Sequence, residues 1–241
     1  MVTFRSTGTE LALSWIAAGA ALVFAAVPLL ANPQGGTLLA TNGPWTSGDY
    51  VQAIFAVHNG DITLPRRGNP KTEAFFDRLI DRGNIEFLMA SSRPVEEKSR
   101  QVLIILSATG EFRGRYGYAV ALGDDVQNEL VQIQIFRLYL IDRLAALTML
   151  DQTGGTRVNS AVATTLSGTL DTLADTHIFS QGQRVALGLA LALHYPAIRT
   201  SLDGPDRQAI SMRLAQMAAA ENDPVLRSAF AAALTETGRG N

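Results

Sequence analysis

The chain has 241 residues, and 47% of them are hydrophobic, which is enough for a sizeable buried core. Its charge is nearly balanced, with 20 basic and 22 acidic side chains, so no net field favours nucleic acid or an anionic membrane surface. The lack of cysteine excludes disulfides, thiolate catalysis, zinc–thiolate sites and iron–sulfur clusters.

The N-terminal region contains a long uncharged and mostly apolar segment, residues 11–31. A helix of this length rises roughly 30 Å, the hydrocarbon thickness of a bilayer, so the sequence predicts a single transmembrane anchor. Arg5 precedes the segment, and the next cations are Arg66 and Arg67. The positive-inside rule therefore places residues 1–10 in the cytoplasm and the rest of the chain outside. The predicted location is the inner membrane of a bacterial-type envelope, with the C-terminal body in the periplasm.

Two other interpretations of this segment remain open. A signal peptide cleaved after Ala31 would release the body to the periplasm, but Leu29 occupies a position where a small residue is preferred. A buried core helix is the second alternative, although a run of this length exceeds what a core helix normally needs.

Residues 32–48 are rich in Gly, Pro, Asn and Thr and carry no charge, so they predict a linker arm before a domain at 49–241. Trp45 is the one aromatic side chain of the arm. We predict either a loosely packed tryptophan or a contact with a neighbouring subunit.

The first part of the domain predicts two helices. Residues 49–59 favour a short helix capped by Asp49, with a strand as the alternative. A second helix starts at Pro70 and ends before Gly83, because proline suits a first turn and glycine a terminus. Its apolar stripe is expected to be buried: Phe75, Phe76, Leu79 and Ile80.

The next segment is ambiguous between helix and hairpin. Ser92 can start a helix in which Glu96 and Arg100 lie four residues apart and support one another. The apolar run 102–106 also suits a buried strand, which would pair with residues 112–122. At most one small hairpin is expected in this chain.

Helix dominates the pattern from residue 125 onward. Apolar side chains recur at helical spacing over residues 125–150, and Arg137, Asp142 and Arg143 indicate a core helix rather than a second membrane span. Short connections favour antiparallel neighbours among the helices that follow, at residues 157–174, 183–195, 205–220 and 224–237. The predicted fold class is therefore mostly α.

The last of these helices carries a recognisable pattern. Asp223-Pro224 opens it, Arg227 follows, and Ala233-Leu234 precede Gly238. Residues 223–238 thereby resemble one helix of a HEAT-type α-helical repeat. The resemblance implies an outward Arg227 and a stack of helices that binds other proteins.

The chemistry-bearing residues form no recognisable catalytic or ligand-binding motif. The histidines His58, His177 and His194 lack metal-site spacing, and His58 and His194 are expected to close apolar helices. No nucleophile motif or phosphate-binding glycine loop is present. The sequence therefore predicts no catalytic residue, no cofactor and no metal.

One segment has the composition of a recognition surface. Arg113, Arg115 and Tyr116 alternate cations with aromatics, which is typical of single-stranded nucleic-acid binders, but a segment beyond the membrane rarely meets nucleic acid. We expect a structural strand, or contacts with proteins or lipid headgroups. Together with Trp45 and Arg227, these residues are the predicted partner contacts, since aromatics and arginines often dominate interfaces.

The sequence thus predicts a membrane-anchored extracytoplasmic interaction module, a scaffold or accessory subunit that binds other membrane or envelope proteins and no nucleic acid. The alternative is a hydrolase-like envelope enzyme using carboxylates brought together from separate helices. A cleft that joins such groups would favour the enzyme, whereas a shallow surface with an apolar centre would favour the module.

Overall fold

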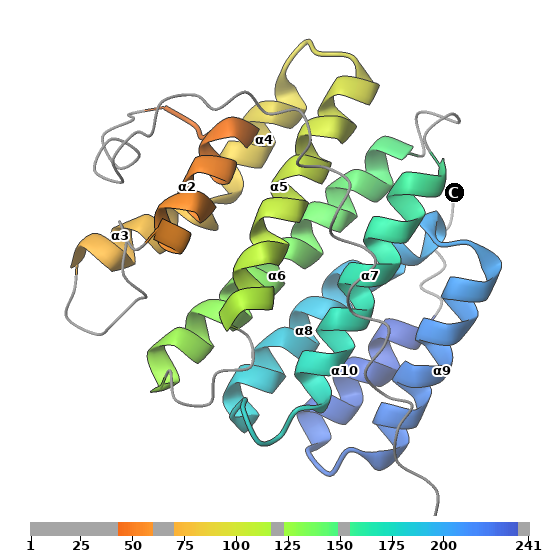
Figure 1. Ribbon diagram of the computed structural model, residues 1–241. Helices are drawn as coiled ribbons and strands as arrows, with labels where there is room; N and C mark the ends of the chain where they lie inside the picture. The colour runs from red at the N-terminus through yellow and green to blue at the C-terminus, as the bar shows by residue number, and fades with distance from the viewer. Residues whose placement is uncertain (1–42, 60–69, 117–122, 149–154, 236–241) are drawn as a thin grey trace, which may run out of the picture. The chain divides into compact units, whose positions relative to one another are not determined.

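The computed structural model describes residues 43–59, 70–116, 123–148 and 155–235, all of them within the compact unit Gln34–Asn241. Every regular element in these ranges is a helix, which confirms the mostly α fold class (Figure 1). The predicted anchor at residues 11–31 lies outside the described residues. Among those that are described, no helix has both the length and the apolar character that a membrane span requires.

The helices from α5 onward stack as consecutive pairs in two layers. Within each pair the helices pack on one another, and α6, α8 and α10 form one layer behind α5, α7 and α9 (Figure 1). The elements are α2 (Ser47–Asn59), α3 (Pro70–Leu79), α4 (Arg82–Ala90), α5 (Val95–Tyr116), α6 (Gly123–Thr148), α7 (Gly155–Ala174), α8 (Gln181–Ile198), the short 3-10 helix η3 (Arg199–Ser201), α9 (Gly204–Ala220) and α10 (Pro224–Leu234).

Helix α2 confirms the helix predicted for residues 49–59 and excludes the strand alternative, but it begins two residues earlier. The backbone N–H of Thr46 donates to Oδ2 of Asp49 at 2.7 Å, and the Asp49 N–H points back to Oγ1 of Thr46 at 3.4 Å. Asp49 therefore occupies the third helical position of a reciprocal capping arrangement and is not the cap itself.

The chain between α3 and α5 departs from the prediction. Phe76 and Leu79 are buried as expected, whereas Ile80 is only half-buried because it follows the last residue of α3. Gly83 does not end the helix; it lies in the first turn of α4. The side chain of Asp81 caps this unpredicted helix by accepting the Gly83 N–H at 2.8 Å.

Helix α5 replaces the hairpin alternative over residues 95–116. Its buried side chains recur every three or four residues, the period of a helix: Val102, Ile105, Leu106, Thr109 and Phe112. Of the two alternatives for this segment, the helix that starts after Ser92 is confirmed, and the strands over 102–106 and over the first part of 112–122 are wrong; residues 117–122 lie outside the described residues. The charged pair is also shifted, because Arg100 bonds Glu97 rather than Glu96.

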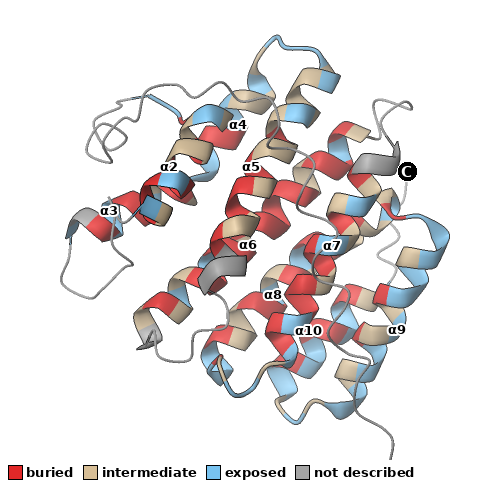
Figure 2. Ribbon diagram, viewed as in Figure 1, coloured by how far each residue is buried: buried red, intermediate tan, exposed pale blue. Residues whose placement is uncertain are grey.

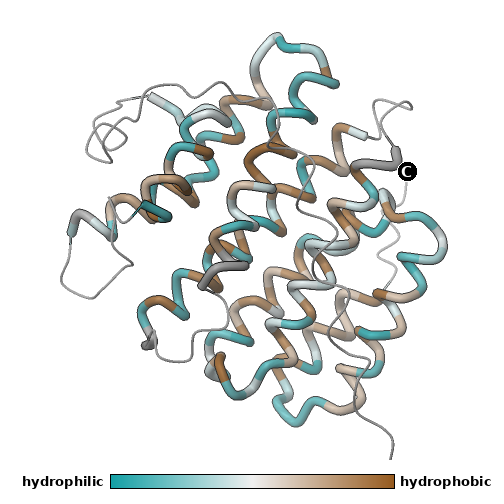
Figure 3. The backbone as a smooth tube through the Cα atoms, in the orientation of Figure 1, coloured by the Kyte–Doolittle hydropathy of each residue, from teal (hydrophilic) through white to brown (hydrophobic). Residues whose placement is uncertain are grey.

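The core runs between the two layers. Helix α6 confirms the predicted core helix, and its apolar stripe is almost wholly buried. Figure 2 shows buried residues on the facing sides of the helices, and Figure 3 shows hydrophobic and hydrophilic residues interspersed along them, as amphipathic helices require. Residues of α2, α3 and α4 extend the same hydrophobic cluster.

Candidate interaction surface on helices α8 and α10

Trp45 belongs to the core and not to a surface contact, which corrects the prediction of a loosely packed or subunit-contacting side chain. It is 3% exposed, and its ring meets Tyr50 edge-on at 5.5 Å and Phe75 at 6.0 Å. Its backbone N–H donates to Oδ1 of the buried Asn84 at 2.8 Å. An aromatic cluster at the start of the domain therefore ties the end of the predicted arm to α2, α3 and α4.

The other predicted contact residues are not brought together at one place. Arg113, Arg115 and Tyr116 form the last turn of α5, where their side chains lie outside the described part of the chain. Their role as contacts stays a prediction. Arg227 is exposed on α10, as expected, but its Nε donates to the Glu221 carbonyl at 3.0 Å and its Nη2 to the Asn222 carbonyl at 3.2 Å. The guanidinium therefore closes the α9–α10 turn.

Helices α8 and α10 approach closely because a glycine faces a leucine. A Cβ at Gly188 of α8 would lie 2.4 Å from Cδ1 of Leu226 and 3.8 Å from Cβ of Ala229, both on α10. Leu226 can thus rest on the α8 backbone only where no side chain intervenes. This contact fixes the two helices as a pair.

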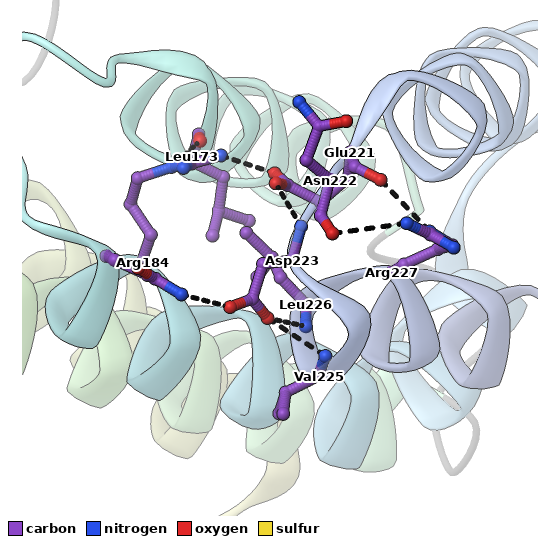
Figure 4. Close-up of polar contacts among 9 residues, drawn as sticks. Leu173, Arg184, Glu221, Asn222, Asp223, Val225, Leu226 and Arg227 are labelled. Carbon is purple, nitrogen blue, oxygen red and sulfur yellow. Dashed lines mark hydrogen bonds and ion pairs between the residues drawn. The ribbon is translucent and has the colours of Figure 1, made fainter.

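An ion pair fastens one end of this helix pair (Figure 4). Arg184 of α8 donates through Nε to the Leu173 carbonyl at 2.7 Å and through Nη2 to Oε2 of Glu221 at 2.5 Å. Burial opposes ionisation of Glu221, but the Asp223 N–H and the Arg184 guanidinium hold its pKa below the usual value. Both side chains are largely shielded, so the pair orients the α9–α10 turn against α8.

Asp223 caps α10 at the same end. Its Oδ1 accepts the N–H groups of Val225 at 2.9 Å and Leu226 at 2.8 Å, and Gln181 of α8 bonds its other oxygen. The Leu226 N–H and then the Gln181 amide lower the pKa of Asp223, so the cap is ionised at neutral pH. The residues that open α10 thus position its next turns beside α8.

An open groove of about 390 Å³ follows the seam between the two helices. Its walls are residues spaced i, i+3, i+4 and i+7, the repeat that places side chains on one helical face. From α8 they are Leu189 and Ala192, and from α10 Pro224, Val225, Ser228, Ala229 and Ala232. Most of these side chains are small, and no carboxylate or cation lines the groove.

Large apolar side chains stand exposed around this groove. Leu189 is 51% exposed, Val225 is 47% exposed, and Leu193, one turn beyond Leu189, is 71% exposed. Reasoning from the sequence missed these residues. The available signal was in α8, whose leucines alternate along the sequence and therefore occupy two sides of the helix: Leu187 and Leu191 face the core, and Leu189 and Leu193 face away from it.

A polar cluster lies elsewhere in the same layer, between α4, α6 and α8. Nδ1 of His194 lies 2.8 Å from Oδ2 of Asp142, and the Tyr139 hydroxyl donates to Glu86 of α4. The guanidinium of Arg143 lies 5.2 Å from the Tyr139 ring centre and 3.8 Å from Asp142. Burial and then the bond to Glu86 raise the pKa of the Tyr139 phenol, which therefore stays protonated. His194 thus bonds α6 from within α8, which corrects its predicted role as a helix terminator.

This cluster joins carboxylates and a histidine from separate helices, but it does not present them to a substrate. His194 is 5% exposed, and its Nε2 is buried without a hydrogen-bond partner among the described residues. A general base must reach the proton it removes, and this nitrogen faces packed protein. The arrangement therefore acts as a polar cross-link between helices.

No group of three or more metal-ligating side chains occurs within the described ranges. Asp171, which lies six residues before His177 in the sequence, accepts a hydrogen bond from Nη2 of Arg213 at 2.6 Å. Comparison with models of known protein families, with curated proteins and with solved structures finds no match to this chain.

Proposed function

We propose that this protein is a membrane-anchored extracytoplasmic interaction module, a scaffold or accessory subunit of an envelope complex, and that it binds a helix of a protein partner through the α8–α10 groove. The groove with its exposed leucines is the observation that carries this proposal. The uncharged segment at residues 11–31 supports the anchor, and Arg5 supports the orientation.

A shallow apolar groove between two helices suits a partner helix. Its walls repeat at i, i+3, i+4 and i+7, and such a surface accepts the apolar stripe of an amphipathic helix. Leu189, Leu193 and Val225 would lose their contact with water when covered, which favours association. The small residues that line the groove leave room for large side chains from the partner.

The stacking of the helices supports a HEAT-type architecture. Each of the pairs α7–α8 and α9–α10 contributes one helix to each of the two layers. Within its layer, α8 contacts both α6 and α10. Repeats of helix pairs present one layer as an extended binding surface, and the groove lies on such a layer. We therefore keep the HEAT-type resemblance of residues 223–238 as part of the proposal.

The alternative, a hydrolase-like envelope enzyme, has less support. It would use carboxylates brought together from separate helices, and the polar cluster contains two of them: Glu86, bonded by Tyr139, and Asp142, bonded by His194. The Nε2 atom of His194 is buried, and the groove carries no titratable side chain. A shallow apolar surface without convergent polar groups favours binding over catalysis.

Charge introduction at the groove tests the proposal. Leu193→Glu places a carboxylate on the exposed stripe, and Met212→Glu, at a 55% exposed position of α9, is the matched control. Membranes containing the full-length protein are solubilised in mild detergent and resolved by native electrophoresis. We expect the wild type and the control to migrate in a complex larger than one chain, and Leu193→Glu to be released from it.

Circular dichroism keeps this test specific for binding. Exposed substitutions usually change stability by less than about 0.5 kcal/mol, so the helical spectrum of Leu193→Glu should match that of wild type. A folded Leu193→Glu variant that remains in the same complex would show that the groove is not the contact surface.

A further inference from the structure

We infer that helix α4 rests on the surface of the membrane in which the chain is anchored, with the ring of Phe87 inserted among the lipid headgroups. This inference rests on the anchor that the proposed function assigns to residues 11–31, but it concerns a different surface from the α8–α10 groove. It is carried by the position of α4 beside the first described residues and by the aromatic side chain that α4 leaves exposed.

The described chain enters the domain beside α4. The carbonyl of Gly43 accepts a hydrogen bond from Nη2 of Arg78, in the last turn of α3, at 2.8 Å. The backbone N–H of Trp45 donates to Oδ1 of Asn84, in the first turn of α4, also at 2.8 Å. Both contacts hold the first described residues where α3 ends and α4 begins.

The connection from the predicted anchor to this point is short. Residues 32–42 separate the anchor from Gly43, and these eleven residues span at most about 40 Å even when fully extended. The start of α4 therefore stays close to the membrane surface. A short connection raises the effective concentration of one group near the other, so a contact with lipid can form here that would be too weak to hold an untethered protein.

Helix α4 presents an aromatic ring on its outer side. Asn84 and Ile85 are buried, whereas Phe87 is 64% exposed. Among the described residues, the exposed large apolar side chains include two aromatic ones, Phe87 of α4 and Phe55 of α2, and both helices lie at this end of the chain; the others are aliphatic or methionine and belong to α8, α9 and α10. Aromatic side chains are typical of the apolar face of helices that lie at a membrane surface. The exposed ring beside the connection to the anchor therefore fits the lipid interface.

The charges of this face make insertion of the ring the main source of the contact. Arg82 is the one cation and Glu86 the one carboxylate of α4. The Glu86 carboxylate accepts from the Tyr139 hydroxyl of α6, and the Arg82 guanidinium lies 4.8 Å from the Tyr139 ring centre. The two opposite charges thus lie on the α6 side of the helix. They give anionic lipid no advantage, so the contact should form on zwitterionic lipid and persist in salt.

A spin label next to Phe87 tests the contact while the ring is still present. The natural chain has no cysteine, so Ala90→Cys, at an exposed position one turn beyond Phe87, provides a single labelling site. The labelled full-length chain is reconstituted in phosphatidylcholine vesicles. Relaxation of the label by oxygen, which dissolves in lipid, is then compared with relaxation by a water-soluble nickel complex. Met212→Cys, at a 55% exposed position of α9, is the matched control.

We expect the ratio of oxygen to nickel relaxation at position 90 to be several times that at position 212. Adding Phe87→Glu to the Ala90→Cys chain should lower this ratio to that of the control, with an unchanged circular dichroism spectrum, because a carboxylate replaces the inserted ring at an exposed site. Three results would overturn the contact: equal ratios at the two positions, shielding of position 90 from both reagents, which would indicate a protein cover, or a ratio that Phe87→Glu leaves unchanged.

The proposed function is separated from this contact by two measurements already named. If position 90 faces water while the chain resists a carbonate wash and Leu193→Glu is released from the native complex, the membrane contact fails and the proposed function stands. If carbonate removes the full-length chain from the membrane, the anchor is absent and both fail.

Discussion

Glu129 of α6 should make the protein less stable as the pH rises. Burial, and then the nearby carboxylates of Asp77, Asp125 and Glu73, raise the pKa of Glu129 from 4.5 to about 6. Between these two pKa values the Glu129 carboxyl is protonated in the folded state and ionised in the unfolded chain. The stabilising contribution is complete below pH 4.5 and is lost as the pH rises through about 6.

The size of the effect follows from the shift. A change of one pKa unit corresponds to about 1.4 kcal/mol, so the shift of Glu129 would amount to roughly 2 kcal/mol for a fully shielded group. The side chain is only half-buried, and solvent screening reduces the expected value to about 1 kcal/mol. Glu129→Gln keeps the volume but cannot ionise, so it should be the more stable protein above pH 6.

Thermal unfolding followed by circular dichroism measures this difference. At about pH 7.5 we expect Glu129→Gln to melt roughly 2–4 °C above wild type, and at about pH 4 the two should coincide. Glu96→Gln removes one charge from an exposed position of α5 and serves as the control. An equal effect at both pH values, or a destabilised Glu129→Gln at high pH, would refute the assigned repulsion.

Three further outcomes are expected. Leu79→Ala removes a fully buried side chain and should lower the free energy of unfolding by about 2–5 kcal/mol in urea titration; a smaller loss would place Leu79 outside the core. Asp142→Ala deprives His194 of its partner and should cost about 1–3 kcal/mol, whereas Asp142→Asn keeps an acceptor and should cost less; equal losses would contradict the cross-link. Full-length protein should remain with membranes after a carbonate wash, and soluble mature protein beginning near Asn32 would instead indicate a cleaved signal peptide.

Periodicity predicted the long helices well, because each is stabilised by burying an apolar stripe, and the residues of that stripe recur in the sequence every three or four positions. The predicted ranges of α6, α7 and α9 agree with the structure to within about two residues, as is usual for helix ends. Helix α8 continues beyond its predicted end at Tyr195 and includes Pro196. A proline near the end of a helix removes one backbone hydrogen bond there without stopping the last turn, since neighbouring packing holds it.

Short helices, and short apolar runs that suit a helix as well as a strand, were predicted less well. The run at 102–106 is apolar enough for a strand, and only the recurrence of Thr109 and Phe112 on the same face identifies the helix. Helix α4 was missed because a glycine such as Gly83 usually marks the end of a helix. In the structure Asp81 caps the start of α4 by accepting the Gly83 N–H, and this contact outweighs the preference of glycine for a terminus.

The candidate surface could not be predicted from the aromatic and arginine residues that were chosen as partner contacts. Aromatic and arginine residues are frequent at interfaces, yet Trp45 is needed by the core and Arg227 by a turn, because burial of an indole and bonding of a guanidinium also stabilise a fold. The groove instead depends on the close approach permitted by Gly188, which follows from the pairing of α8 with α10. Only the structure shows which side of α8 packs on the core: Leu187 and Leu191 are buried on that side, and Leu189 and Leu193 remain exposed on the other.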